Sequence, residues 1–306
     1  MKLLIEFLIF PGFIFLAAAG GILAWLDRKI TARIQYRVGP PWYQSFADLL
    51  KLSGKEIVIP KDANVPMFIL APFLGMSALL LSGFILYKIN IFNTPGFIGD
   101  IIVLVYLFTI PSLSLILAGF ASSNPLASLG SSREIKLLLG YEIPFILGLL
   151  VPVIKTGSIR FYDIIQFQLE HGAILYSASG IIAFIAVMLS VQAKMGLVPF
   201  DIAEAETEII SGPLVEYSGI LLGIFKLNKM LMLAVFPVFI LSCFWNGFGN
   251  ANLLLIDILK FLALIVIFTL IRNTNPRLRI DQALRFFWLK LSTISLIAVI
   301  LALGGM

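Results

Sequence analysis

Five carboxylates fall within one short stretch of this chain, residues 196–219, which reads GLVPFDIAEAETEIISGPLVEYSG. The stretch stands between two long apolar segments, each long enough to lie in a membrane. A carboxylate surrounded by lipid is costly and usually pairs with a cation or passes protons, whereas in water it is an ordinary solvated charge. Proton transfer or electrostatic coupling is therefore the chemistry to test. The residues are Asp201, Glu204, Glu206, Glu208 and Glu216.

Other ionisable side chains lie inside the apolar segments. Glu142 lies about one turn into one segment, and Lys226 and Lys229 lie about three to four turns into another. The two lysines are spaced i and i+3 and share a helix face, where a carboxylate partner would keep them charged. Glu142, Glu216 and the acidic residues of 196–219 are the candidate partners. Such a row of opposite charges suits a proton relay, while a solvated acidic loop remains the alternative for 196–219.

The overall composition is that of a membrane protein. Of 306 residues, 60% are hydrophobic and 13% are charged, which excludes a soluble globular domain. The single cysteine, Cys243, and the single histidine, His171, are too few for an iron–sulfur cluster, a structural zinc or a nickel–iron centre. No glycine-rich phosphate-binding loop is present. The sequence therefore predicts no metal or cofactor on this chain, no nucleic-acid partner, and a lipid bilayer around it.

Apolar runs of about 20 residues predict an all-α polytopic membrane protein with about eight spanning helices, in one membrane domain covering residues 1–306. The expected spans are residues 3–26, 67–87, 101–121, 137–154, 174–191, 217–244, 253–271 and 286–304. The connections expected to carry function are residues 27–62, 122–136, 194–216 and 272–285.

Lys and Arg concentrate in the odd-numbered connections between these spans. By the positive-inside rule, those connections lie in the cytoplasm. Both termini are therefore predicted outside a cell (plasma) membrane, with the four functional connections on the cytoplasmic side.

The first connection is far longer than a turn and predicts an amphipathic helix at the membrane surface. In WYQSFADLLKLSGKE the apolar residues Phe46, Leu49 and Leu52 interleave with Asp48 and Lys51 at helical spacing. A basic loop obeying the positive-inside rule would explain the charges but not this spacing.

Four stretches carry the most distinctive patterns: LDRKITARIQYRVGP with QSFADLLKLSGKE, SSNPLASLGSSREIKLLLGYEIP, GLVPFDIAEAETEII with LVEYSG, and PRLRIDQALRFFW. Together they resemble the quinone-chamber membrane subunit of respiratory complex I, the H subunit in bacteria. They also resemble its homologue in energy-converting membrane-bound nickel–iron hydrogenases. The motifs occur in the family's order, one set in each predicted cytoplasmic connection.

Within this family the chain is more similar to the hydrogenase branch. Quinone-reducing members usually carry extra residues after Arg-x-Gly-Pro, and the segment GPPWYQSFAD, residues 39–48, lacks them. The passages SSREIKLLLGYE and RIDQALRFFW are also more similar to that branch. The resemblance thus implies a ferredoxin-linked, ion-translocating oxidoreductase of the membrane-bound hydrogenase or sulfur-reducing type.

By this resemblance the chain is a non-catalytic subunit that anchors a peripheral redox arm and starts a path of charges toward ion pumps. The implied partners are peripheral hydrogenase-like and iron–sulfur subunits, small membrane subunits and antiporter-like subunits, with iron–sulfur clusters and a nickel–iron centre expected on partners. The residues expected to line a chamber or dock the arm are Arg28, Arg33, Gln35, Arg37, Asp48 and Lys51. Those expected to carry protons or coupling are Glu142, Asp201, Glu204, Glu206, Glu208, Glu216, Lys226, Lys229, Arg277, Arg279 and Asp281.

Two alternative functions and one departure from the family pattern stay open. The alternatives are a quinone-chamber subunit of a complex I-type enzyme and a stand-alone secondary ion transporter, although no internal repeat of the transporter kind is visible. The departure is Asn228-Lys229, where complex I usually has an alanine followed by a glutamate. Lys229 could pass a proton when neutral, or as a fixed cation hold Glu142 or Glu216 ionised.

Overall fold

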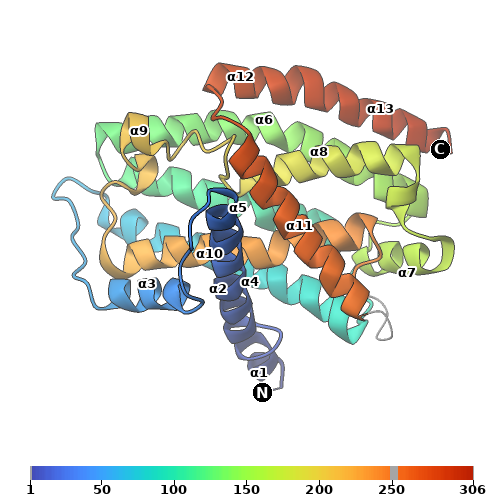
Figure 1. The fold of residues 1–306 in the computed structure, drawn as a ribbon, viewed down its shortest axis with the longest axis horizontal. Helices are drawn as coiled ribbons and strands as arrows, with labels where there is room; N and C mark the ends of the chain where they lie inside the picture. The colour runs from blue at the N-terminus through green and yellow to red at the C-terminus, as the bar shows by residue number, and fades with distance from the viewer. Residues whose placement is uncertain (1, 249–253, 306) are drawn as a thin grey trace.

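The computed structural model describes residues 2–248 and 254–305, and every regular element in this part of the chain is helical (Figure 1). Two 3₁₀ turns, Ile174–Tyr176 and Gly212–Leu214, interrupt the connections, and a π-helical turn, Phe286–Leu291, joins α12 to α13. The helices are α1 (Lys2–Leu8), α2 (Phe13–Ile34), α3 (Gln44–Ser53), α4 (Val65–Phe92), α5 (Asp100–Ala121), α6 (Pro125–Thr156), α7 (Phe161–His171), α8 (Ala178–Lys194), α9 (Glu206–Ile209), α10 (Gly219–Phe244), α11 (Leu254–Thr274), α12 (Ile280–Arg285) and α13 (Ser292–Leu303).

Seven helical segments of the described residues are long and apolar enough to cross a membrane. Five are α4, α5, α6, α10 and α11, and the other two are Ile5–Ile34, which contains α2, and Ile280–Leu303, which unites α12 and α13. The remaining expected span, residues 174–191, corresponds to α8, an apolar helix of 17 residues. The predicted all-α polytopic fold is therefore confirmed, with seven long spans and one shorter apolar helix.

The largest difference from the expected spans is at α6, which begins at Pro125 and makes most of connection 122–136 helical. The Asn124 side chain accepts a hydrogen bond from the Leu126 N–H at 2.8 Å, and a proline at the first helical position needs no N–H partner. One helix of 32 residues therefore carries both Glu134 and Glu142.

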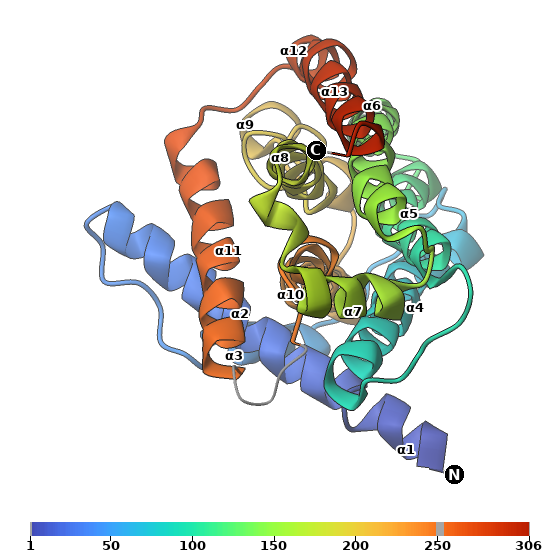
Figure 2. The same ribbon diagram turned by 90° about the vertical axis from the view of Figure 1, so that its right-hand side faces the viewer.

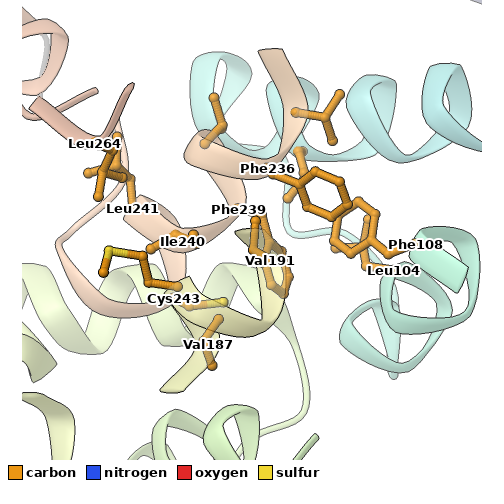
Figure 3. Close-up of a cluster of buried hydrophobic side chains, with 14 of the residues drawn as sticks. Leu104, Phe108, Val187, Val191, Phe236, Phe239, Ile240, Leu241, Cys243 and Leu264 are labelled. Carbon is orange, nitrogen blue, oxygen red and sulfur yellow. The ribbon is translucent and has the colours of Figure 1, made fainter. Parts of the chain in front are cut away.

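Helix α10 lies at the centre of the bundle. Figure 2 shows it nearly end-on, surrounded by the other long helices. Of its most apolar window, 83% is buried, against 28% in α11, as expected for a helix that is apolar all round. Phe236 and Phe239 of α10 pack against Phe108 of α5, with ring centroids 4.7 and 4.9 Å apart, in the main core (Figure 3).

Helix α2 crosses α10 steeply instead of running beside it (Figures 1 and 2). Gly20 makes this close crossing possible, because a Cβ built there would lie 2.5 Å from the Met230 carbonyl oxygen of α10. Small residues allow this kind of backbone approach between membrane helices. The crossing brings Asp27 and Arg28, at the end of α2, to the same end of the bundle as the lysines of α10.

Gly20→Ala is expected to destabilise the protein by about 1–3 kcal/mol, because the obstructing atoms belong to the α10 backbone and cannot rotate away. Detergent-induced unfolding of the intact complex measures the loss. Gly54→Ala is the matched control, since the nearest atom to its added Cβ is 4.0 Å away. A Gly20→Ala protein as stable as the control would contradict this account of the crossing.

Helix α3 is the amphipathic helix predicted in the first connection. It contacts α2 and α10 through an inner face on which Leu52 is 8% exposed, whereas Leu50 on its outer face is 73% exposed. The ring of Phe46 fills the space in front of Gly21 in α2. The helix therefore holds Asp48 close to the end of α2.

Candidate functional site

A cavity of about 610 Å³, called the chamber below, opens at the end of the bundle where α2, α10 and α11 meet the acidic hinge, residues 196–219. Its walls combine apolar residues such as Leu197, Phe225 and Met230 with an unusual number of charges. The ionisable residues lining it are Asp27, Arg28, Glu204, Lys226, Lys229 and Arg272.

Two ion pairs fix the wall of the chamber formed by α2. Asp27, which is 7% exposed, accepts hydrogen bonds from Arg272 Nη1 at 2.5 Å and from the Thr269 hydroxyl at 2.9 Å, both on α11. Arg28 pairs with Asp48 of α3 at 3.1 Å. Burial raises the pKa of the Asp48 carboxyl, but hydrogen bonds from Arg28 and Gln44 outweigh this effect and hold that pKa below its ordinary value. The α2 wall is therefore tied to α11 by the Arg272–Asp27 ion pair and to α3 by the Arg28–Asp48 ion pair.

Lys226 and Lys229 of α10 also line the chamber. Lys229 donates a hydrogen bond to Glu204 of the hinge. Of the candidate partners that the sequence left open, Glu204 is therefore the one that pairs with Lys229, and not Glu142 or Glu216. Lys226 faces the chamber as well and lies close enough to Asp48 to act on it electrostatically. The contact between Lys229 and Glu204 ties the hinge to the central helix.

Behind this contact lies a small cavity of about 50 Å³, lined by Glu204 and Lys229 on the chamber side and by Glu134 and Lys194 on the far side. Glu134 of α6 is 6% exposed. The Ser112 hydroxyl lines the same cavity and shares a hydrogen bond of 2.8 Å with the Tyr141 hydroxyl. Polar groups therefore continue from the chamber into the interior of the bundle.

A buried ion pair continues this row. Lys194, at the end of α8, donates to Glu142 of α6 at 2.5 Å, and its side chain is 0% exposed. The ammonium also lies 4.9 Å from the ring centroid of Tyr141 and 4.4 Å from that of Phe145. Glu142 itself is half-buried and reaches an apolar groove of about 490 Å³ on the surface between α5 and α6.

The hinge is largely irregular, and its carboxylates point to different partners. Glu204 precedes α9, a helix of four residues, so Glu204 and Glu208 do not share a helix face. Other polar contacts anchor the hinge along its length. Arg133 pairs with Glu208 at 2.6 Å, Arg277 pairs with Asp201 at 2.9 Å, and Asn124 donates to Glu216 at 2.5 Å. The side chain of Glu206 lies outside the described part of the structure.

The remaining residues singled out in the sequence do not line the chamber. Arg279 and Asp281 line a separate surface cavity of about 390 Å³ next to the hinge. Four further residues are exposed on the first connection and the end of α2, where they do not line the chamber. They are Arg33, Gln35, Arg37 and Lys51.

Four ionisable residues of the site were not singled out from the sequence as carriers of the function: Asp27, Glu134, Lys194 and Arg272. Glu134 stands about two turns before Glu142, but the sequence places it in the connection 122–136, so only the early start of α6 at Pro125 puts both carboxylates on one helix. Lys194 follows the apolar run 174–191, so the sequence places it in the connection 194–216 and not inside a spanning helix. Its pairing with Glu142 depends on how α6 and α8 pack.

Residues 5–303 match the family model described as NADH dehydrogenase. The chain belongs to this family. It is 33% identical to the H subunit of the NADH-quinone oxidoreductase of Rhodospirillum centenum, over 92% of this chain and 88% of that protein. It is 31% identical to the H subunit of the corresponding enzyme of Carboxydothermus hydrogenoformans, over 93% of this chain and 87% of that one.

This member of the NADH dehydrogenase family is also similar to a chain in the structure of the membrane-bound sulfane sulfur reductase, an archaeal respiratory membrane complex. The TM-score is 0.89 and the identity is 28%, over 99% of this chain and 100% of that one. The chain is therefore a membrane-embedded, multi-pass counterpart of the H subunit, in a multi-subunit complex I-like respiratory oxidoreductase.

Proposed function

We propose that this chain is the membrane-anchor and coupling subunit of a ferredoxin-linked, ion-translocating complex of the hydrogen-evolving or sulfur-reducing type. The redox centres belong to partner subunits, because one cysteine and one histidine cannot hold an iron–sulfur cluster or a nickel–iron site. The termini face the outside of the plasma membrane, and the chamber opens on the cytoplasmic side beneath the peripheral arm.

The observation that carries this proposal is the row of ionisable side chains running from the chamber to the surface. The row starts at the ion pair of Lys229 with Glu204, continues through buried Glu134, and ends at the ion pair of Lys194 with Glu142. Lysines and glutamates follow one another along the row, and each of these side chains can hold a charge or exchange a proton. Proton relays and electrostatic coupling in membranes need such an arrangement. A change of charge at a redox centre beside the chamber can thereby alter the protonation of Glu142 at the surface between α5 and α6.

Exposed basic residues near the chamber supply the docking surface for the peripheral arm in this proposal. Arg33, Arg37 and Lys51 are exposed at the chamber end of the bundle and suit a partner with acidic side chains. The groove beside Glu142 suits a membrane subunit that continues the path toward antiporter-like pumps, because a half-buried carboxylate facing lipid would be costly.

A quinone-chamber subunit is the second candidate function. The chamber volume of about 610 Å³ would hold a quinone headgroup, and the curated relatives are named quinone oxidoreductase subunits. The ionisable residues that line the chamber favour water and ions over an apolar tail, and this charge supports the first candidate.

The intact complex, purified in mild detergent and given reduced ferredoxin, is expected to form hydrogen from protons, or sulfide when polysulfide is supplied, at the same rate with and without added quinone. No hydrogen or sulfide, but oxidation of ferredoxin that requires added quinone as the electron acceptor, would establish the second candidate instead. A Leu222→Phe variant distinguishes the two candidates further, because the larger side chain narrows the chamber. The rate of a quinone-dependent reaction should fall to zero in this variant, whereas the rate of a quinone-independent reaction should stay within about twofold of the wild-type rate. Leu50→Phe on exposed α3 is the matched control.

A further inference from the structure

A second cavity, of about 490 Å³, lies at the end of the bundle opposite the chamber. It is formed where α6, α7 and α13 end, the end that Figure 2 faces. Gln168 of α7 donates to the Ser242 carbonyl at the far end of α10, which fixes α7 across that end of the central helix. None of the ionisable residues assigned above to the chamber or the row lines this cavity.

The cavity has basic side chains and no acidic ones among its described lining. Lys155 stands in the last turn of α6 and forms no ion pair within the described residues. His171, the only histidine of the chain, ends α7 and stacks on Phe167 with ring centroids 4.5 Å apart. Its Nδ1 lies 3.3 Å from the Phe167 carbonyl oxygen, so Nε2 is left for a ligand.

Apolar residues form the rest of the wall. Ile154, Ile174 and Ala302 line the cavity beside the basic groups. Tyr176, which is 77% exposed, stands at its rim together with the end of a membrane-spanning helix, a position typical of the membrane–water interface. A free phosphate ion would leave most of this volume and all of this apolar wall unused.

We propose that this cavity binds the phosphate-bearing headgroup of an anionic membrane lipid. Lys155 and His171 contact the phosphate oxygens, and the wall of Ile154, Ile174 and Ala302 accepts the glycerol backbone and the start of an acyl chain. The site is independent of the chamber and of the acceptor that the complex uses. Its role is to fix the ends of α6 and α13, at the side of the bundle that carries the row from Glu134 to Glu142.

The test uses the intact complex, stripped of lipid in detergent and titrated with phosphatidylglycerol while its thermal unfolding midpoint is followed. Lys155→Gln is expected to raise the half-saturating lipid concentration about fivefold, the effect of one basic group on an anionic headgroup. His171→Gln, at an exposed position, should give a shift in the same direction. Arg160→Gln removes a charge from the nearby connection outside the cavity and should change nothing.

An uncharged glycolipid with the same acyl chains and inorganic phosphate complete the design. The proposal predicts that the glycolipid fails to distinguish wild type from Lys155→Gln, and that millimolar phosphate does not replace the lipid. Equal phosphatidylglycerol titrations in wild type and both variants would overturn the site. Full stabilisation by phosphate alone would overturn the lipid as its source.

Discussion

Glu134→Gln is expected to leave the complex assembled while the number of ions moved per electron falls by about 100-fold or more. The amide keeps the shape and hydrogen-bonding reach of the carboxyl, so packing between α5 and α6 is preserved. It cannot take up a proton or carry a charge. Glu134 is 6% exposed and lines the small cavity that separates the two ion pairs of the row, so the path has to pass it.

The measurement is ion uptake by proteoliposomes that contain the intact complex, related to ferredoxin oxidised in the same sample. Glu170→Gln is the matched control, because it makes the same chemical change at an exposed glutamate on α7. An unchanged ratio of ions to electrons in Glu134→Gln would remove this residue from the path. A parallel loss in the control would point to a general effect of the preparation.

The sequence predicts those parts of the fold that depend on local patterns. Apolar runs of span length predict the long helices, and the apolar and charged spacing around Asp48 predicts α3. The carboxylate of Glu142 stands out because a charge inside an apolar run is rare. Helix ends are less well predicted: the Asn124 cap starts α6 about three turns before its apolar run begins.

The pairing of charges depends on packing and so could not be read from the sequence. Lys229 meets Glu204 because the hinge folds back onto α10, and their separation of 25 positions along the chain fixes no particular contact. Lys194 meets Glu142 across 52 positions because α6 and α8 pack side by side. Five carboxylates fall within the hinge sequence, yet the four whose side chains are described bind four different side chains, Arg277, Lys229, Arg133 and Asn124. The row through Glu134 forms because the packing of α6, α8, α10 and the hinge brings together residues that are far apart in the sequence.

The position of Lys229 also bears on the departure from the family pattern. Its ammonium contacts the hinge carboxylate of Glu204, so a cation on α10 is matched by an anion on the hinge. If Lys229 were replaced by a glutamate while Glu204 stayed, two carboxylates would be in contact at the small cavity and would repel each other. The hinge and α10 therefore have to be considered together when the relay is compared between relatives.

Glu142→Gln is expected to lower the apparent stability of the complex by about 3–5 kcal/mol, because it leaves the fully buried Lys194 ammonium without a counter-ion. Glu6→Gln is the matched control. Its partner Lys88 lies 3.1 Å away, but both side chains are partly exposed, so the loss should stay below about 1 kcal/mol. Unfolding in a graded series of denaturing detergent mixtures measures both variants.

The double variant Glu142→Gln with Lys194→Met separates stability from coupling. Removing both charges eliminates the unpaired buried ammonium, and a methionine fits the contacts with Tyr141 and Phe145, so most of the stability should return. Ion translocation should be lost in both the single and the double variant, because the row then ends at Glu134. A double variant that pumps normally would show that this pair only supports packing. One that regains stability without pumping would assign the pair to the coupling path, because the packing would be restored and only the ionisable groups would be missing.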